Sequence, residues 1–431
     1  MKRTVFFAFV ISLFAMASWG KTWNLTSTMT ATLDDKGVLT IATTKQAEAM
    51  PDFESDLSLS IPWILDRLVF ISIIIEEGVT GIGNYAFNEF YNLKSVTIPN
   101  TITTIGIMAF SNCHSLTSVT IPNSVTTINY MAFSNCRNLN SLTIPNSVTL
   151  IGRNAFNGCS SLTSLNIPNS ISMIGQGTFA GCSNLISITI PNSVTAIEAD
   201  AFASCSSLTS VTIPNSVTTI DNGAFRGCIN LTSVIIPNSV TTISAGVFSD
   251  CNKLTSVMIP NSVTEIRMYA FENCTSLTSI SIPKSVTLLG QAVFNNCLSL
   301  KDVTVEWDTP LLFVFNDTFK GVKMSSATLH IPVGTKALYQ SANVWKDFGS
   351  IVEYSSINNE LVEYKSLKTF SSNGILNVTG IQNCMSLSIY NLSGQLVYKG
   401  MVKAETEQIS FNTQGTYIVV AGNQTIKTII K

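Results

Sequence analysis

Hydrophobic and polar positions along this chain repeat with a period of 23 residues. Proline recurs at that step, at Pro99, Pro122, Pro145, Pro168, Pro191, Pro214, Pro237, Pro260 and Pro283. Phenylalanine keeps the same step from Phe87 to Phe294, and cysteine keeps it from Cys113 to Cys297. Leucine follows three residues after each of these cysteines. Four registers held at one period predict a repeat architecture.

One unit, residues 116–138, shows what each repeat contains. Leu116, Val119 and Ile121 are apolar, whereas Ser118 and Thr120 are small and polar. This alternation predicts a short β-strand with one buried face, because successive side chains of a strand point to opposite faces. The proline that follows has no N–H to donate to a sheet and therefore ends the strand.

The rest of the unit supplies two more inward-facing segments. Val125 and Ile128 predict a second short strand, and Ala132 and Phe133 point inward from a short 3₁₀ or helical turn. A single coil cannot bury these groups, but stacked coils form a continuous core with one parallel strand per coil. We therefore expect a solenoid of about eleven coils over residues 66–333.

The open ends of such a stack need caps, because they expose core and unpaired strand edges. Residues 21–65 predict an N-terminal β cap, in which Met29 to Thr43 form a hairpin and Trp23 and Trp63 cover the first coil. The neighbouring stretch from Leu68 to Ile75 is apolar, short and β-branched, which predicts a buried strand.

Residues 334–355 predict a C-terminal helical cap. Its apolar side comprises Leu338, Tyr339, Trp345 and Phe348.

The first twenty residues have the pattern of a secretory signal peptide. Lys2 and Arg3 form a basic start, Val5 to Met16 form an apolar run, and a cleavage point follows near Gly20. The run is too short to span a bilayer. We expect residues 1–20 to be removed, and the mature chain to be secreted or to lie at the outer cell surface, without a transmembrane segment.

The repeat "LTSVTIPNSVTTINYMAFSNC" resembles the BspA-like leucine-rich repeats of bacterial surface proteins. The stretch "LHIPVGTKALYQSANVWKDFGSIVE" is similar to the segment that often closes such arrays. The resemblance covers about residues 66–353. It implies a leucine-rich-repeat solenoid used for attachment, which in some members includes binding to host matrix proteins.

From Ser356 onward the period is lost, and residues 356–431 predict a small β-sandwich of the immunoglobulin-like type. The expected strands are Ile375–Val378, Leu387–Tyr390, Leu396–Tyr398, Ile409–Phe411, Tyr417–Val420 and Ile426–Ile430. "LSIYNLSGQLVYKG" and "GTYIVVAGNQTIKTIIK" look like the C-terminal sorting domain of type IX secretion. That resemblance implies the type IX secretion machinery of a Bacteroidota-type bacterium as a partner. The alternative is an ordinary immunoglobulin-like module.

Charge and cysteine content narrow the possible functions. Only 12 % of the residues are charged and the formal net charge is −2, so no basic surface for nucleic acid or anionic membrane is expected. Nine of the ten cysteines occupy one position per coil, which corresponds to the buried Asn/Cys site of leucine-rich repeats. We expect free, buried thiols there, with partial cross-coil disulfides as the alternative.

Candidate catalytic and metal-binding residues are few. His114 and His330 are the only histidines, and no C-x-x-C occurs, so no zinc site is expected. Glu198, Asp200 and Asp221 fall in loop positions and are interpreted as solvated surface groups. Without a nucleophile motif or a phosphate-binding loop, we expect a protein that is not an enzyme and needs no cofactor or metal.

The outward side of the predicted parallel sheet is the candidate binding face. One residue per coil points outward there: Thr97, Thr120, Thr143, Asn166, Thr189, Thr212, Ile235, Met258 and Ser281. A second outward column runs from Ser95 to Ser279 at the same step. The change to Ile235 and Met258 makes the later coils the better candidate for a contact patch. The alternative is that both columns only keep the sheet soluble.

Two functions remain open. The first is adhesion or protein binding through the solenoid face, with a host extracellular-matrix protein or another cell's surface protein as the partner. The second is a glycan-binding or structural envelope component. Because sugar sites usually need aromatic platforms and the sheet face offers none, the first is favoured.

Overall fold

The computed structural model describes residues 20–54 and 61–354 and seven short stretches of the C-terminal part. These are residues 368–372, 375–379, 386–391, 396–401, 406–411, 414–421 and 424–430. The chain divides into two compact units, Met1–Tyr354 and Ser355–Lys431. Apart from Gly20, the predicted signal peptide lies outside the described residues.

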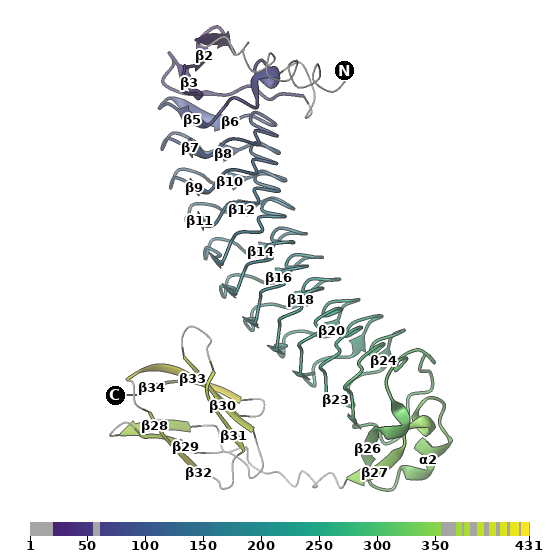
Figure 1. Cartoon of the computed structure of the whole chain (residues 1–431). Helices are drawn as coiled ribbons and strands as arrows, with labels where there is room; N and C mark the ends of the chain where they lie inside the picture. Colours follow the sequence, from purple (N-terminus) through teal and green to yellow (C-terminus); the bar gives the residue numbers. More distant parts are fainter. Residues whose placement is uncertain are drawn as a thin grey trace, which may run out of the picture. The chain divides into compact units, whose positions relative to one another are not determined.

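The first unit is a single file of stacked coils (Figure 1), about 12 in number and about 23 residues apart. Each coil contributes one strand to a parallel sheet. These strands are β5 (Ser72–Ile75), β7 (Ser95–Thr97), β9 (Ser118–Thr120), β11 (Ser141–Thr143), β13 (Ser164–Asn166), β15 (Ser187–Thr189), β17 (Ser210–Thr212), β19 (Ser233–Ile235), β21 (Ser256–Met258), β23 (Ser279–Ile282), β25 (Asp302–Val305) and β26 (Thr328–Pro332). The predicted leucine-rich-repeat solenoid is confirmed.

A shorter strand follows on the next side of each coil, which we call the second-strand side. Its strands are β4 (Glu48–Ala49), β6 (Val79–Ile82), β8 (Thr104–Ile105), β10 (Thr127–Ile128), β12 (Leu150–Ile151), β14 (Met173–Ile174), β16 (Ala196–Ile197), β18 (Thr219–Ile220), β20 (Thr242–Ile243), β22 (Glu265–Ile266) and β24 (Leu288–Leu289). Most neighbouring strands pair in parallel, as in Ile128 with Ile151, and they form three sheets, with breaks between β12 and β14 and between β18 and β20. Both predicted strands of the repeat are therefore present.

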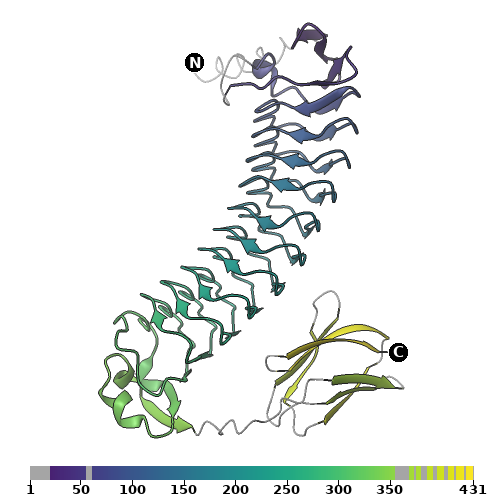
Figure 2. The same ribbon diagram turned by 180° about the vertical axis from the view of Figure 1, so that it is seen from behind.

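The third side of each coil consists of tight turns, where the sequence suggested a 3₁₀ or helical turn (Figure 2). Met131 and Asn135 both have left-handed backbone angles, with φ of 54° and 58°. Glycine occupies the same two positions two coils later, at Gly177 and Gly181. Within this turn, the Phe133 N–H donates to the Ala155 carbonyl of the next coil, at 2.8 Å. The turns therefore join coils to one another.

The core is a ladder of phenylalanine rings. From Phe110 to Phe294, each ring stacks on its neighbour in the next coil, with centroids 5.2–5.8 Å apart. Trp63 extends the ladder at one end, 5.9 Å from Phe87, and Phe319 extends it at the other. Stacking of this kind makes each coil depend on its two neighbours.

The nine cysteines of the coils are buried and unpaired, as expected. Each thiol lies 3.2–3.5 Å from a phenylalanine carbonyl oxygen of the preceding coil, as Cys205 does with Phe179. Burial raises the pKa of the Cys228 and Cys297 thiols to about 12. The thiolate is the reactive form, so these thiols are inert in the folded solenoid. Cys384 lies outside the described residues.

The N-terminal end carries a three-stranded antiparallel sheet. β1 (Lys21–Asn24), β2 (Met29–Leu33) and β3 (Val38–Thr43) pair in order, and β3 then pairs in parallel with β5. The predicted hairpin is thus present. Nearby, the Thr43, Thr26 and Thr28 hydroxyls donate to the Glu48 carboxylate. These hydrogen bonds, led by that of Thr43, lower the pKa of Glu48 to about 2.

The stretch from Leu68 to Ile75 is only partly a buried strand, so that prediction is wrong in part. Strand structure covers only β5, and Leu68 and Ile71 are 50 % and 42 % exposed. Phe70 and Ile73 are fully buried. The sheet of the first coil is solvated on its outer side, so side chains there alternate between core and solvent although all but Ser72 are apolar.

The C-terminal end is closed by η3 (Met324–Ser326), α2 (Lys336–Ser341), η4 (Trp345–Asp347) and the edge strand β27 (Ser350–Tyr354). Tyr339 and Trp345 are fully buried, and the Tyr339 hydroxyl donates to the Trp307 carbonyl at 2.9 Å. Leu338 was expected on the apolar side but is 46 % exposed. Helix α2 is less than two turns long, so only one of these neighbouring residues faces the core.

The second unit contains two antiparallel sheets, consistent with the predicted β-sandwich. One has the order β28 (Lys368–Ser372), β29 (Ile375–Thr379), β32 (Thr406–Ser410), and the other β31 (Leu396–Met401), β30 (Ser386–Asn391), β33 (Gly415–Ala421), β34 (Gln424–Ile430). Leu376, Leu387 and Val419 are among its fully buried residues. Strand β28 was not predicted, because its sequence KTFSS contains a single large apolar residue.

Candidate binding face

The structure places every residue of the predicted outer column on the solvent side of the parallel sheet. We call Thr97, Thr120, Thr143, Asn166, Thr189, Thr212, Ile235, Met258 and Ser281 the threonine column; all are exposed. The residue before each points inward, as the buried Val119 and Leu142 do. Parallel pairing keeps the column in register, for example Thr120 opposite Thr143.

The column is longer than the sequence indicated. Ile74 pairs with Thr97 at one end, and Thr304, His330 and Val352 continue the register at the other. His330 is half-buried in this column, and its ring nitrogen lies 3.1 Å from the Asp302 carboxylate. The step between β25 and β26 is longer than 23 residues, so His330 departs from the constant period, whereas Ile74 and Thr304 keep it.

The hydroxyls of the column differ from those elsewhere on the solenoid. On the second-strand side, the Thr126 hydroxyl donates to the Thr103 carbonyl of the preceding coil at 3.3 Å, and Ser193 donates to Ile171 at 2.7 Å. No side-chain hydrogen bond joins Thr120, Thr189 or Thr212 to another described residue. Because those hydroxyls have no structural role in the described coils, they can serve a partner.

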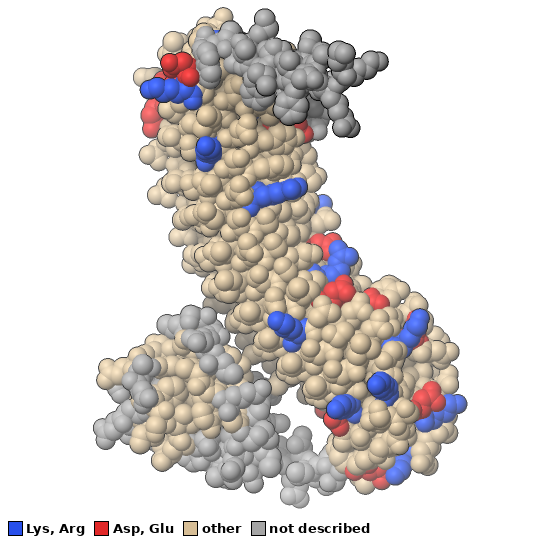
Figure 3. Space-filling view, in the orientation of Figure 1, with Lys and Arg blue, Asp and Glu red and all other residues tan. Residues whose placement is uncertain are grey.

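Two apolar residues interrupt the hydroxyls. Ile235 and Met258 lie directly opposite each other on β19 and β21, and each is 49 % exposed. Charged side chains are sparse on the visible side of the middle coils and more frequent at the C-terminal end of the solenoid (Figure 3). The neighbouring column positions Thr212 and Ser281 are uncharged, so a partner that covers this pair would desolvate few charges.

The acidic residues interpreted as solvated surface groups remain partly exposed, and two of them also form ion pairs between coils. Glu198 lies 3.7 Å from the Arg153 guanidinium and accepts the Gln176 N–H at 2.8 Å. Asp200 pairs with Arg226 at 3.1 Å. Sequence spacing does not reveal these pairs, because the partners are one or two coils apart.

Among the described residues, the two histidines lie in different coils of the solenoid. Burial lowers the pKa of His114, whose ring lies 5.0 Å from that of Tyr91. Among the described residues, no three His, Cys, Asp or Glu side chains lie close enough to hold a metal ion. In the same part of the chain, no helix is long and apolar enough to cross a bilayer.

Stacked coils with one parallel strand each, a buried Phe/Cys core and an exposed sheet define a leucine-rich-repeat solenoid. The family model described as "BspA type Leucine rich repeat region" matches residues 80–209 and 195–321, in 6 copies. The chain belongs to this family.

Solved structures of bacterial proteins are similar to it. A leucine rich cell surface protein from Faecalibacterium prausnitzii A2-165 is 28 % identical, with a TM-score of 0.41 over 66 % of this chain and 94 % of that one. A leucine-rich repeat protein from Bacteroides ovatus is 22 % identical, with a TM-score of 0.44 over 77 % and 100 %. The pneumococcal vaccine antigen PcpA is 16 % identical, with a TM-score of 0.40 over 78 % and 99 %. No curated protein matches the chain.

Proposed function

We propose that this chain is an exported, non-catalytic surface protein that binds another protein through the threonine column and thereby acts in adhesion. The partner is a host extracellular-matrix protein or a surface protein of another cell. The family and the surface location named for the F. prausnitzii protein support a surface role. The observation that favours this face is the exposed Ile235–Met258 pair within a column of unused hydroxyls.

The magnitudes are compatible with a specific contact. Fully burying an Ile or Met side chain contributes about 1.5–3 kcal/mol, and each hydroxyl hydrogen bond adds about 0.5–1.5 kcal/mol. Micromolar affinity corresponds to about 8 kcal/mol of net binding free energy. The apolar pair and several threonines of neighbouring coils must therefore act together, so the contact spans more than two coils.

Changing Met258 to glutamate should weaken binding to a protein partner at least about tenfold, because a charge would be buried where a thioether was. The measurement is binding of the soluble chain to decellularised epithelial matrix, with and without prior protease treatment of the matrix. Met173→Glu is the matched control, since Met173 is 46 % exposed on the second-strand side. Equal loss in both variants, or binding that survives protease treatment, contradicts the proposal.

We also propose that residues 1–20 are a signal peptide and that residues 356–431 are recognised by type IX secretion machinery. Protease shaving of intact cells, followed by mass spectrometry, tests both. We expect solenoid peptides to be released from the surface. We expect peptides beyond Ser356 to be absent if the sorting domain is cleaved on export. Protein found only inside the envelope, with its C-terminal peptides intact, would contradict the proposed sorting role.

A further inference from the structure

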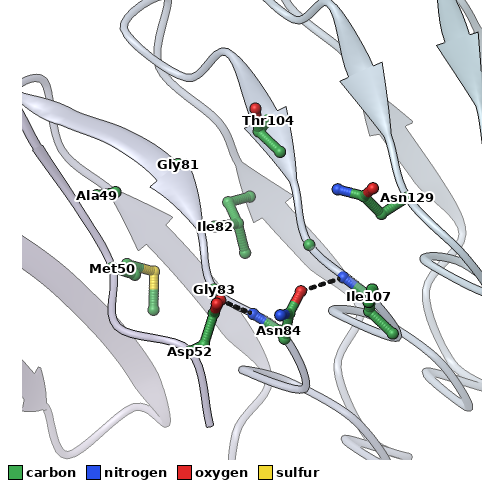
Figure 4. A pocket seen from close by; sticks show the side chains of 11 residues that line it. Ala49, Met50, Asp52, Gly81, Ile82, Gly83, Asn84, Thr104, Ile107 and Asn129 are labelled. Carbon is green, nitrogen blue, oxygen red and sulfur yellow. Dashed lines mark hydrogen bonds between the residues drawn. The ribbon is translucent and has the colours of Figure 1, made fainter.

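A hollow of about 400 Å³ lies on the second-strand side, at the N-terminal end of the solenoid (Figure 4). It is separate from the threonine column, which belongs to the other sheet. The side chains that matter for its chemistry are Met50, Asp52, Asn84, Ile107 and Asn129. Its volume falls within the range of small-molecule sites, about 300–1,000 Å³.

One lining position lacks the side chain that its equivalents in the next two coils carry. Gly81 of β6 pairs with Thr104 of β8, which in turn pairs with Thr127 of β10. Threonine therefore fills this position in the next two coils, while Gly81 leaves it open beside Ala49 of β4. The glycine is not needed for its backbone angles, since its φ lies outside the left-handed region.

Three polar side chains around the hollow are held in fixed orientations. The Asn84 N–H donates to Asp52 Oδ1 at 2.9 Å, and the Ile107 N–H donates to Asn84 Oδ1 at 2.6 Å, as Figure 4 shows. Asn129 Nδ2 donates to the Ile105 carbonyl at 3.0 Å. Each of these planar groups uses one polar atom to bind the backbone. The remaining polar atom is a carboxylate oxygen in Asp52, the amide nitrogen in Asn84 and the amide oxygen in Asn129. Because each group is already held in place, a ligand that binds this atom orders the side chain at little cost in entropy.

The lining selects a class of ligand. The lining offers two hydrogen-bond acceptors, on Asp52 and Asn129, and one donor, on Asn84. Its described residues include a carboxylate but no lysine or arginine. An anionic ligand is therefore disfavoured, whereas sugar hydroxyls both donate and accept. Ile107, which is half-buried, supplies apolar contact for the C–H face of a sugar ring.

We propose that this hollow binds a neutral oligosaccharide, of which one or two rings enter it. Asp52 and Asn129 accept hydrogen bonds from ring hydroxyls, and Asn84 donates one. The site goes beyond the protein-binding role of the threonine column and is independent of it. Since few groups contact each ring, the affinity for one chain is low, with a Kd of about 1 mM.

Saturation-transfer NMR on the chain without its signal peptide tests this site. The probes are cellohexaose, maltohexaose and mannohexaose, and at least one should bind. Gly81→Thr should reduce binding at least about tenfold, because it refills the hollow with the side chain that the next coil carries. The added Cβ lies 3.4 Å from the Ala49 Cβ and 3.9 Å from the Thr104 carbonyl oxygen, so the fold should tolerate it.

Asp52→Asn provides a second variant that keeps the acceptor for the Asn84 N–H and removes the charge. It should weaken binding several-fold, whereas Asp200→Asn, the same change at a carboxylate outside the hollow, should leave it unchanged. Absence of saturation transfer from all three sugars at about 10 mM overturns the proposal. So does unchanged binding by both Gly81→Thr and Asp52→Asn, because the sugar would then occupy another surface.

Discussion

Changing Phe202 to alanine should lower the free energy of unfolding by about 3–5 kcal/mol. The side chain is fully buried, and its ring stacks on Phe179 at 5.7 Å and on Phe225 at 5.4 Å. Its carbonyl also accepts the Cys228 thiol of the next coil at 3.3 Å. The substitution therefore leaves a cavity in the middle of the ladder and weakens the interfaces on both sides.

The consequence differs from that of a core mutation in a globular domain. In a solenoid, stability is close to a sum over coils and nearest-neighbour interfaces, so a weak central interface allows the two halves to unfold separately. We expect urea unfolding monitored by circular dichroism to become two-step or to show a smaller m-value. Phe313→Ala is the matched control, because Phe313 is 66 % exposed and should change stability by less than about 0.5 kcal/mol. Equal effects of the two variants would refute the ladder as the source of cohesion.

Most of the solenoid could be predicted from its period. Since every coil contacts the next in the same way, a position such as Phe133 or Cys136 must face the core if its equivalents do. Burial at both positions follows from repetition alone. Where the period ended, prediction was less successful. Leu338 was misplaced because it lies in the C-terminal cap, where no equivalent position in another coil indicates which way a side chain points.

The third side of the coil could not be predicted from residue type. Its left-handed positions hold Asn and Gly in some coils, which favour that conformation, but Met131 and Tyr269 in others, which do not. There the hydrogen bonds from coil to coil impose the backbone angles, and no single repeat shows this. The same limit hid the Glu198–Arg153 and Asp200–Arg226 pairs, which join coils.

The candidate sites differ in how far the sequence reveals them. The threonine column follows from strand alternation, so its outward direction was predictable; what it binds was not. The hollow beside Gly81 depends on one missing side chain in one coil and on Asp52, which comes from the cap. A constant period predicts the positions that repeat in every coil. A site formed where one coil departs from the period, beside a cap, can be recognised only from the structure.

Changing Trp63 to alanine should destabilise the N-terminal coils by about 3–5 kcal/mol while sparing those further along. Trp63 is fully buried, stacks on Phe87 at 5.9 Å and donates its indole N–H to the Ala86 carbonyl at 2.9 Å. Because it covers the first ring of the ladder, its loss exposes that ring to water. Hydrogen exchange monitored by mass spectrometry should show faster exchange in β5 and β7 and unchanged exchange in β17 and β19.

Trp63→Phe separates the two contributions of this side chain. A phenylalanine can still stack on Phe87 but cannot donate to Ala86, so its cost should be about 1–2 kcal/mol with the same gradient of exchange along the array. The gradient distinguishes a cap from a core residue, because nearest-neighbour coupling transmits the loss of a cap only as far as the next stable interface. Uniformly faster exchange from β5 to β26 would mean that the solenoid unfolds as one cooperative unit. That result would also contradict the prediction that the two halves of the Phe202→Ala variant unfold separately.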